Sequence, residues 1–386
     1  LTSKSPLQEH RDFYPTVLIP SGAKPRKGRL GMRFIITAVL IALISSPLGI
    51  CSSSSQDPGP LGAQVFADRS VLLPNGSYPL AALAGDSNGQ IYVLAWDQVV
   101  KLSRNGEIIK RVALKKGQGP GEVQNYPAVM TMGLDGNLYV YDGAKFIVFT
   151  ADLKFVRNIP VMMTGRDFHV DKDGNLYCRK SDFGAAQPEE FLAKYSSQGK
   201  LVGEYKRTPD LAMSMAGGMA IRTPHPYVPM NLYCLDPQDV MYFLPNTGSQ
   251  VSRLDSQGAS VPAFKVDTKD IPISKDEKAE VERRYVGGTS SNAPMSVELR
   301  YPDHRPYYRK ILIDENGRFY LVRTESVLAK GKEATIDVYQ AGRGRSELRL
   351  GGDPLLVHQG YIYYVVNQDD GVGELTGAIM RSRVPD

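Results

Sequence analysis

A short unit recurs along residues 86–368, in which a tight polar turn is followed by a β-rich run with an aromatic residue at a fixed place. The clearest copies are DSNGQIYVLAWDQVVKLSRNGEI (86–108), LDGNLYVYDGAKFIVFTADLKF (134–155), DKDGNLYCRKSDF (171–183), DPQDVMYFLPNTGSQVSRLDSQG (236–258), DENGRFYLVRTES (314–326) and HQGYIYYVVNQ (358–368). Aligned on the turn, the copies place equivalent residues at Gly89, Gly136, Gly174, Asp239, Gly317 and Gly360. Their spacings of 38 to 78 residues suit a four-stranded unit with insertions.

Each unit predicts an antiparallel meander of four strands. An apolar strand such as RKILI precedes the turn and a second strand follows it, while runs such as KFIVFT and KLVGEYK supply the third and fourth. We expect two-residue turns, and glycine suits them because two-residue hairpins require positive φ. We therefore predict an all-β, six-bladed β-propeller with four-stranded antiparallel blades and one short helical insertion. A β-helix or two stacked sandwiches would also give regular short strands, but neither predicts one recurring turn at the start of a four-strand unit.

The last unit is one strand short. After HQGYIYYVVNQ the chain supplies one more strand, GAIMRSRV (377–384), whereas AQVFADRSVLL (63–73) precedes the first complete unit and has no other blade to join. We expect the N-terminal strand to complete the last blade and close the ring, which removes two exposed sheet edges. Loss of this strand is expected to expose an inner edge. An independent N-terminal extension is the alternative.

The N-terminal region predicts export. Arg33 precedes eleven apolar residues, FIITAVLIALI (34–44), which suit a signal peptide and are too few to span a bilayer. SSPLGIC ends at Cys51 and SSSSQDPGP follows it. We predict a disordered or over-extended leader at 1–31, a signal peptide at 32–50, a Ser-rich tether at 51–61 and the propeller at 62–386. Cys51 is a candidate for lipid attachment; simple secretion and an uncleaved membrane anchor are the alternatives.

Three features together resemble a known family: the D-x-x-G-N-L-Y turns, GQGPGE (117–122) between the first two blades, and YPDHRPYYRKILIDENGRFYLV (301–322) after a short helical insertion. Over residues 62–386 the chain resembles the six-bladed propeller lipoproteins of Gram-negative bacteria, relatives of the NHL-repeat propellers. The segment ending at Cys51 is similar to a bacterial lipoprotein signal, although Ile50 stands where a small residue is usual. The resemblance implies a lipid-anchored propeller in the cell envelope, facing the periplasm or the cell exterior, with lipid on Cys51.

Charge argues against a nucleic-acid partner. The net charge of +5 arises in residues 1–50, and the rest of the chain carries 39 basic and 39 acidic residues. The basic surface of a nucleic-acid binder is therefore missing. Beyond Cys51 only Cys178 and Cys234 remain, in different predicted blades, so we expect buried free thiols.

Insertions gather on one predicted face. The first-to-second and third-to-fourth turns are short, whereas second-to-third loops and blade-to-blade links include 184–190, 208–229, 266–306, 327–334 and 369–376. Within 266–306, residues 274–286 predict a helix with Ser274 as its N-cap. Because long loops on a rigid scaffold often carry binding residues, we predict a ligand site on this rim. Insertions could also accumulate there only because the other face has tight turns.

The candidate ligand-binding residues are one histidine of an inner strand and a set of cations and aromatics on the rim. They are His169, Arg166, Arg222, His225, Tyr301, His304 and Arg305. The other inner positions aligned with His169 are Ala84, Thr131, Cys234, Leu312 and Leu355, too apolar a ring to hold a divalent metal.

Neither a zinc motif nor a nucleophile elbow occurs in the sequence, so we assign no catalytic residue, metal or cofactor. The GQGPGE segment is interpreted as a tight inter-blade crossing. We expect a binding module that recognises a protein or glycan and attaches to the membrane through its lipid. A lyase or hydrolase of the NHL or lactonase-like propellers is the alternative.

Overall fold

The computed structural model describes residues 63–68, 80–95, 97–125, 127, 129–165, 167–182, 188–211, 213–216, 219–222, 225–285, 299–329, 333–340, 343–369 and 375–385. The predictions for the leader, the signal peptide and the tether (1–61), including lipidation of Cys51, lie outside these ranges. Within them, no helix has the length and apolar character needed to cross a bilayer.

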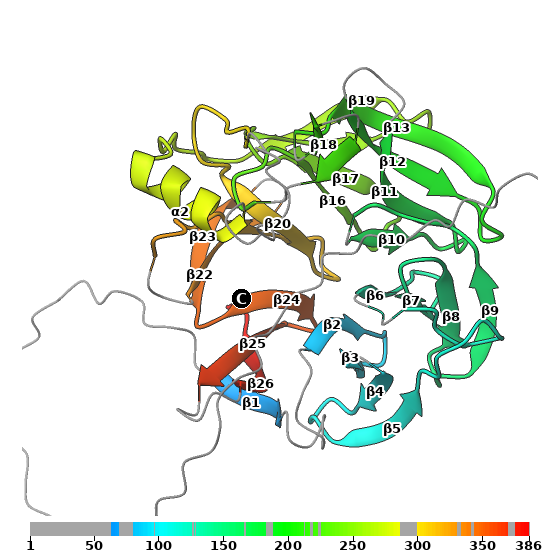
Figure 1. Ribbon diagram of the computed structural model, residues 1–386. Coiled ribbons are helices and arrows are strands. Elements are labelled where there is room, and N and C mark those ends of the chain that lie inside the picture. The colour runs from blue at the N-terminus through cyan, green and yellow to red at the C-terminus, as the bar shows by residue number, and fades with distance from the viewer. Residues whose placement is uncertain are drawn as a thin grey trace, which may run out of the picture. The chain divides into compact units, whose positions relative to one another are not determined.

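The described strands form six four-stranded antiparallel sheets, which are the blades of a β-propeller (Figure 1). Blade 1 holds β2 (Leu80–Gly85), β3 (Ile91–Ala95), β4 (Gln98–Leu102) and β5 (Ile108–Ala113). Blade 2 holds β6 (Val129–Met132), β7 (Asn137–Tyr141), β8 (Phe146–Thr150) and β9 (Phe155–Ile159). Blade 3 holds β10 (Phe168–Val170), β11 (Leu176–Asp182), β12 (Glu189–Tyr195) and β13 (Leu201–Pro209).

The remaining blades follow the same order. Blade 4 holds β16 (Asn231–Leu235), β17 (Met241–Pro245), β18 (Gln250–Leu254) and β19 (Ser260–Lys265). Blade 5 holds β20 (Tyr308–Ile313), β21 (Phe319–Arg323), β22 (Ala334–Gln340) and β23 (Arg343–Leu350). Blade 6 holds β24 (Asp353–His358), β25 (Tyr361–Asp369), β26 (Leu375–Arg383) and the N-terminal strand β1 (Ala63–Asp68). The predicted all-β, six-bladed architecture is confirmed.

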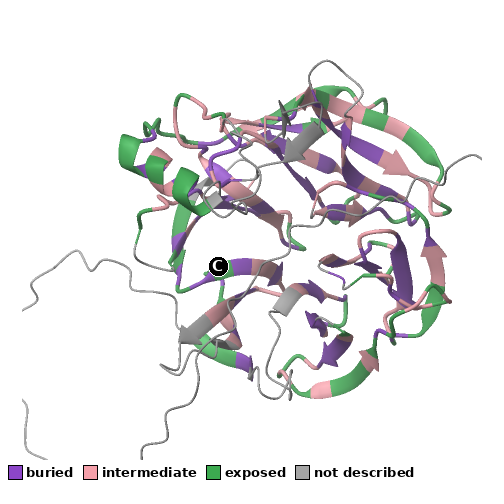
Figure 2. Ribbon diagram, in the orientation of Figure 1, coloured by how far each residue is buried: buried purple, intermediate pink, exposed green. Residues whose placement is uncertain are grey.

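The first strands of consecutive blades line the centre and close the ring. Each of β2, β6, β10, β16, β20 and β24 contacts its neighbour, and β24 returns to β2. Apolar clusters fill the spaces between neighbouring blades, so the core consists of separate layers rather than one central mass. Figure 2 shows the consequence: buried residues concentrate on the second and third strands of the blades, such as β3 and β8, and exposed residues on outer strands such as β5.

All six residues aligned on the first turn have positive φ, between 71° and 78°. The turn is a three-residue loop rather than the expected two-residue one, because Gly89 N–H donates to Asp86 O and Asp86 N–H donates to Gln90 O. The Asp86 carboxylate accepts the N–H groups of Asn88 and Gln90 and the Tyr92 hydroxyl at 2.9 Å. In blades 2 and 5 the tyrosine at the same place, Tyr139 or Tyr320, likewise donates its hydroxyl to a turn carboxylate.

The N-terminal strand completes blade 6, as predicted. β1 pairs antiparallel with β26, and the sheet order is β1-β26-β25-β24. The expectation of an inner edge was wrong, because β24 is innermost and β1 is the outermost strand. Phe66 and Ala67 are buried in the layer between blades 6 and 1, whereas Val65 is 65% exposed. Residues 69–73 of the predicted strand lie outside the described ranges.

The described insertions contain one helix and one hairpin. Helix α2 (Lys275–Tyr285) lies on the rim and begins at the predicted cap, where Ser274 Oγ accepts Glu277 N–H and Glu277 Oε2 accepts Ser274 N–H. β14 (Met213–Ala216) and β15 (Met219–Arg222) pair in a small sheet within the 208–229 insertion. The same insertion also contributes residues to the hydrophobic core, because Tyr227 and Val228 are buried.

Candidate functional site

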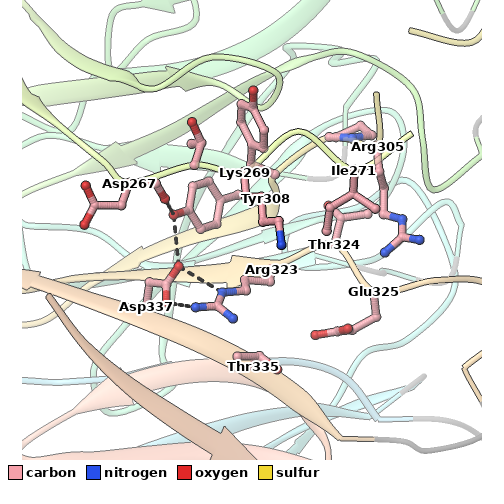
Figure 3. Close-up of a pocket in the computed structure, with 13 residues that line it drawn as sticks. Asp267, Lys269, Ile271, Arg305, Tyr308, Arg323, Thr324, Glu325, Thr335 and Asp337 are labelled. Atoms are coloured by element: carbon pink, nitrogen blue, oxygen red, sulfur yellow. Dashed lines mark hydrogen bonds and ion pairs between the residues drawn. The ribbon is translucent and has the colours of Figure 1, made fainter. Parts of the chain in front are cut away.

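A cavity lies on the insertion-rich rim, between blades 4 and 5. Its volume is about 360 Å³, and we call it the blade 4–5 pocket. It lies on the predicted face, since its walls come from the link after β19 and from the loop between β21 and β22. Its lining residues are Asp267, Thr268, Lys269, Ile271, Arg305, Pro306, Tyr307, Tyr308, Arg323, Thr324, Glu325, Thr335 and Asp337 (Figure 3).

Backbone contacts hold the pocket wall against blade 5. Asp267 N–H donates to the Tyr339 hydroxyl at 2.9 Å, and Arg305 N–H donates to Ile271 O at 2.8 Å. Thr324 N–H donates to Tyr307 O at 3.0 Å, which fixes the end of β21 beside the link. The link that forms the pocket wall is therefore hydrogen-bonded to blade 5 at two places, at Tyr339 and at Thr324.

An ion pair between the half-buried Arg323 and the buried Asp337 lies on one side of the pocket (Figure 3). The Arg323 guanidinium donates to both oxygens of Asp337, at 2.7 Å and 3.0 Å, and to Glu347 at 2.7 Å. Tyr308 adds a hydroxyl donor to Asp337 at 3.0 Å. Burial lowers the pKa of Arg323, but the hydrogen bonds to Asp337 and Glu347 outweigh that effect and raise it. Arg323 is therefore a fixed, internally neutralised cation.

Other polar groups of the pocket have no partner among the described residues. Lys269 and Glu325 line the same cavity, yet no ion pair joins them to each other or to another described residue. The buried Oγ1 of Thr324 and the buried Nε of Arg305 have no hydrogen-bond partner there either. Unsatisfied buried polar atoms are costly, so these atoms favour contact with a buried water.

Of the predicted site residues whose side chains the structure describes, Arg305 alone lines this pocket. Its guanidinium also donates to Glu277 at 2.7 Å, so much of its charge serves the attachment of α2. His304 lies beside the pocket, where its ring stacks on the lining residue Tyr307 with 4.7 Å between centroids.

His225 and Tyr301 belong to the attachment site of α2. Their rings pack 5.0 Å apart, and His225 Nε2 lies 3.2 Å from Arg300 O. Burial lowers the pKa of His225, so the ring is neutral at pH 7. Tyr301 also packs against the cluster around Tyr227, so both residues serve packing in the described part of the chain.

His169 lies elsewhere, on β10, in a second cavity of about 170 Å³ in the central channel. Of the other aligned inner positions, Thr131, Cys234 and Leu312 line the same cavity. His169 Nε2 lies 3.1 Å from Tyr233 O, and since a carbonyl only accepts, this nitrogen carries the hydrogen. Burial lowers the pKa of His169, so the ring is neutral. Arg166 and the side chain of Arg222 lie outside the described part of the structure.

Sequence reasoning missed Lys269, Thr324 and Glu325. Lys269 lies inside the 266–306 insertion, and Thr324 and Glu325 follow β21 immediately before the 327–334 insertion. The available indication was their position in or beside two insertions on one face of adjacent blades. The predicted site residues are mainly histidines and arginines, so these three were not among them.

Two further predictions concern residues outside the pocket. The Glu122 carboxylate accepts Gly119 N–H at 2.8 Å, and a Cβ on Gly117 would meet that carboxylate at 2.1 Å, so GQGPGE is a tight inter-blade crossing. Cys178 and Cys234 are buried free thiols, as expected. In the described ranges no group of three or more His, Cys, Asp or Glu side chains could hold a metal ion.

No protein-family model and no curated protein matches this chain. Among solved structures, a member of the DUF4221 family from Bacteroides vulgatus is 11% identical, with a TM-score of 0.45 over 80% of this chain and 93% of that one. A catalytically inactive virginiamycin B lyase from Staphylococcus aureus, solved with quinupristin, is 15% identical, with a TM-score of 0.41 over 81% and 83%. A gluconolactonase from Xanthomonas campestris is 10% identical, with a TM-score of 0.41 over 81% and 88%. We draw no functional argument from similarities this distant.

Proposed function

We propose that this chain is an exported, lipid-anchored binding module that recognises a protein or glycan through its insertion-rich rim. The blade 4–5 pocket is the recognition site in this proposal. The observation that carries it is a rim cavity of about 360 Å³ in which Lys269, Glu325 and Thr324 Oγ1 lack partners among the described residues. Ligand sites typically have about this size and combine apolar walls with a few convergent polar groups.

The rigidity of the walls supports the same proposal. Arg323 and Asp337 are held by their mutual hydrogen bonds, and the link that carries Lys269 is attached to blade 5. A preformed site loses little conformational entropy when a ligand binds. Loops that only connect blades would not require polar groups aimed at a common cavity.

The recognition proposal is tested with the double variant Lys269→Gln/Glu325→Gln on glycan and peptide arrays. Lys275→Gln/Glu282→Gln is the matched control, because both residues are exposed on α2 of the same rim and the net charge is again unchanged. We expect the pocket variant to weaken every array hit at least tenfold and the control to bind as the wild type does. Hits that survive the pocket variant would place recognition elsewhere.

The anchoring part of the proposal rests on the apolar segment that ends at Cys51. Metabolic labelling with a fatty-acid analogue should tag the wild type and leave Cys51→Ser unlabelled. Labelling that persists in Cys51→Ser would refute the anchor. An unlabelled, freely secreted wild type would support ordinary cleavage instead, and stoichiometric calcium or zinc in the purified protein would favour the lyase or hydrolase alternative.

A further inference from the structure

The charges of the blade 4–5 pocket are not all open to a ligand. Arg323 is neutralised by Asp337 and Glu347, and Arg305 pairs with Glu277 at 2.7 Å. The Asp267 carboxylate points away from the middle of the cavity (Figure 3). Lys269 and Glu325 are left as one open cation and one open anion in the lining.

These two open charges come from different elements. Lys269 belongs to the link after β19, and Glu325 follows β21 of the next blade. In Figure 3 both side chains reach toward the space beside Arg323. Because the elements are fixed to the same blade 5 sheet, the two charges stay apart instead of collapsing into an ion pair.

We infer that the blade 4–5 pocket takes a zwitterionic ligand, in which a carboxylate and an ammonium group lie a few atoms apart, as in a free short peptide. This inference rests on the proposed function, since it names the ligand chemistry of the same site. The carboxylate faces the Lys269 ammonium, which can donate a hydrogen bond to it. The ammonium faces Glu325.

Desolvation explains why both charges of the ligand matter. A ligand with one charge satisfies one pocket residue and removes water from the other, which leaves a charge without a partner. A ligand with both charges satisfies the two together. Each charged hydrogen bond contributes enough that capping one end of the ligand should weaken binding about tenfold or more. The remaining walls, Ile271 and Tyr307, contact the short apolar side chains of such a ligand.

The test compares three matched probes by calorimetry on the purified protein: L-alanyl-L-alanine, its N-acetyl derivative and its C-terminal amide. We expect the uncapped dipeptide to bind the wild type at least tenfold more tightly than either capped form. In Lys269→Met the dipeptide and the amide should bind equally, because the carboxylate has lost its partner. In Glu325→Gln the dipeptide and the acetylated form should bind equally.

Controls separate this inference from the proposed function. Lys275→Gln, on the exposed face of α2, should leave the preference for the dipeptide unchanged, and melting temperatures should match across all variants. Equal affinity for the three probes, or binding of none of them, would overturn the zwitterion inference. If array hits still depend on Lys269 and Glu325 in that case, the recognition proposal stands without it.

Discussion

Replacement of Gly106 by alanine should open the seam between blade 6 and blade 1. Gly106 has a φ of 87° in the third-to-fourth turn of blade 1, and a Cβ there would lie 1.9 Å from the backbone oxygen of Phe66 in β1. That oxygen belongs to backbone and cannot rotate away. The substitution therefore displaces β1 from its place beside the turn.

Two terms make up the expected loss of stability. An alanine in the left-handed region costs about 1–2 kcal/mol. Displacing β1 also withdraws Phe66, which is 5% exposed and packs edge-on against Tyr363 with 5.0 Å between ring centroids. Removal of a buried Phe side chain costs about 3–5 kcal/mol. Gly106→Ala should therefore destabilise the fold by about 4–7 kcal/mol, a large part of a typical total of about 5–15 kcal/mol.

Gly136→Ala is the matched control, because Gly136 has a φ of 78° and nothing within 4 Å of the added Cβ. Gly136→Ala introduces only the backbone strain and should lower the free energy of unfolding by about 1–2 kcal/mol. Urea unfolding followed by circular dichroism measures both variants, and Phe66→Ala reports the packing term directly. Equal losses for Gly106→Ala and Gly136→Ala would refute the role of β1 in closing the ring.

Two ion-pair predictions follow from burial. The Arg179 side chain is 6% exposed and pairs with the partly exposed Asp167 and the buried Glu190. Arg179→Met should cost about 3–5 kcal/mol in urea unfolding, because the buried Glu190 carboxylate loses this cation. Arg207→Met, at a 40% exposed side chain, should cost much less, because water screens its ion pairs, and the reverse order would contradict this. Burial raises the pKa of Glu277, but hydrogen bonds from Ser326, Tyr227 and Ser274 and the Arg305 charge lower it to about 2 from 4.5. Its carboxylate therefore stabilises the fold above pH 4.5, and this contribution is lost as the pH falls toward 2. Glu277→Gln should lose less stability than the wild type between pH 6 and pH 3, and Glu282→Gln should behave as the wild type.

The blades were predictable because their information is local. A turn carboxylate such as Asp86 binds N–H groups two and four residues ahead and the Tyr92 hydroxyl six residues ahead, so one short segment encodes the whole turn. The repetition of that segment then gives the number of blades. The outer position of β1 was not predictable from the same pattern, because a missing strand does not show which edge of the sheet it leaves open.

The pocket was less predictable because its residues meet only through tertiary contacts. Lys269 and Glu325 are 56 positions apart in the sequence, and neither carries a motif. Conversely, His225 and Tyr301 are polar aromatics on rim loops, yet the structure uses them for packing against each other. The positions of the insertions led to the rim on which the blade 4–5 pocket lies, whereas the identity of the open groups depended on which charges were already paired.

Glu277 shows how an insertion with little apolar content can still be held rigidly. In α2 the same carboxylate completes the N-terminal capping box and accepts hydrogen bonds from Tyr227, Ser326 and Arg305. These partners come from the link before blade 4, the loop after β21 and the segment before β20, so one buried anion joins α2 to three segments of the rim. Arg305 lines the blade 4–5 pocket, and its position therefore depends on the charge of Glu277. Helix α2 thus holds the lining residue Arg305 in place through Glu277, although the helix itself contributes no lining residue.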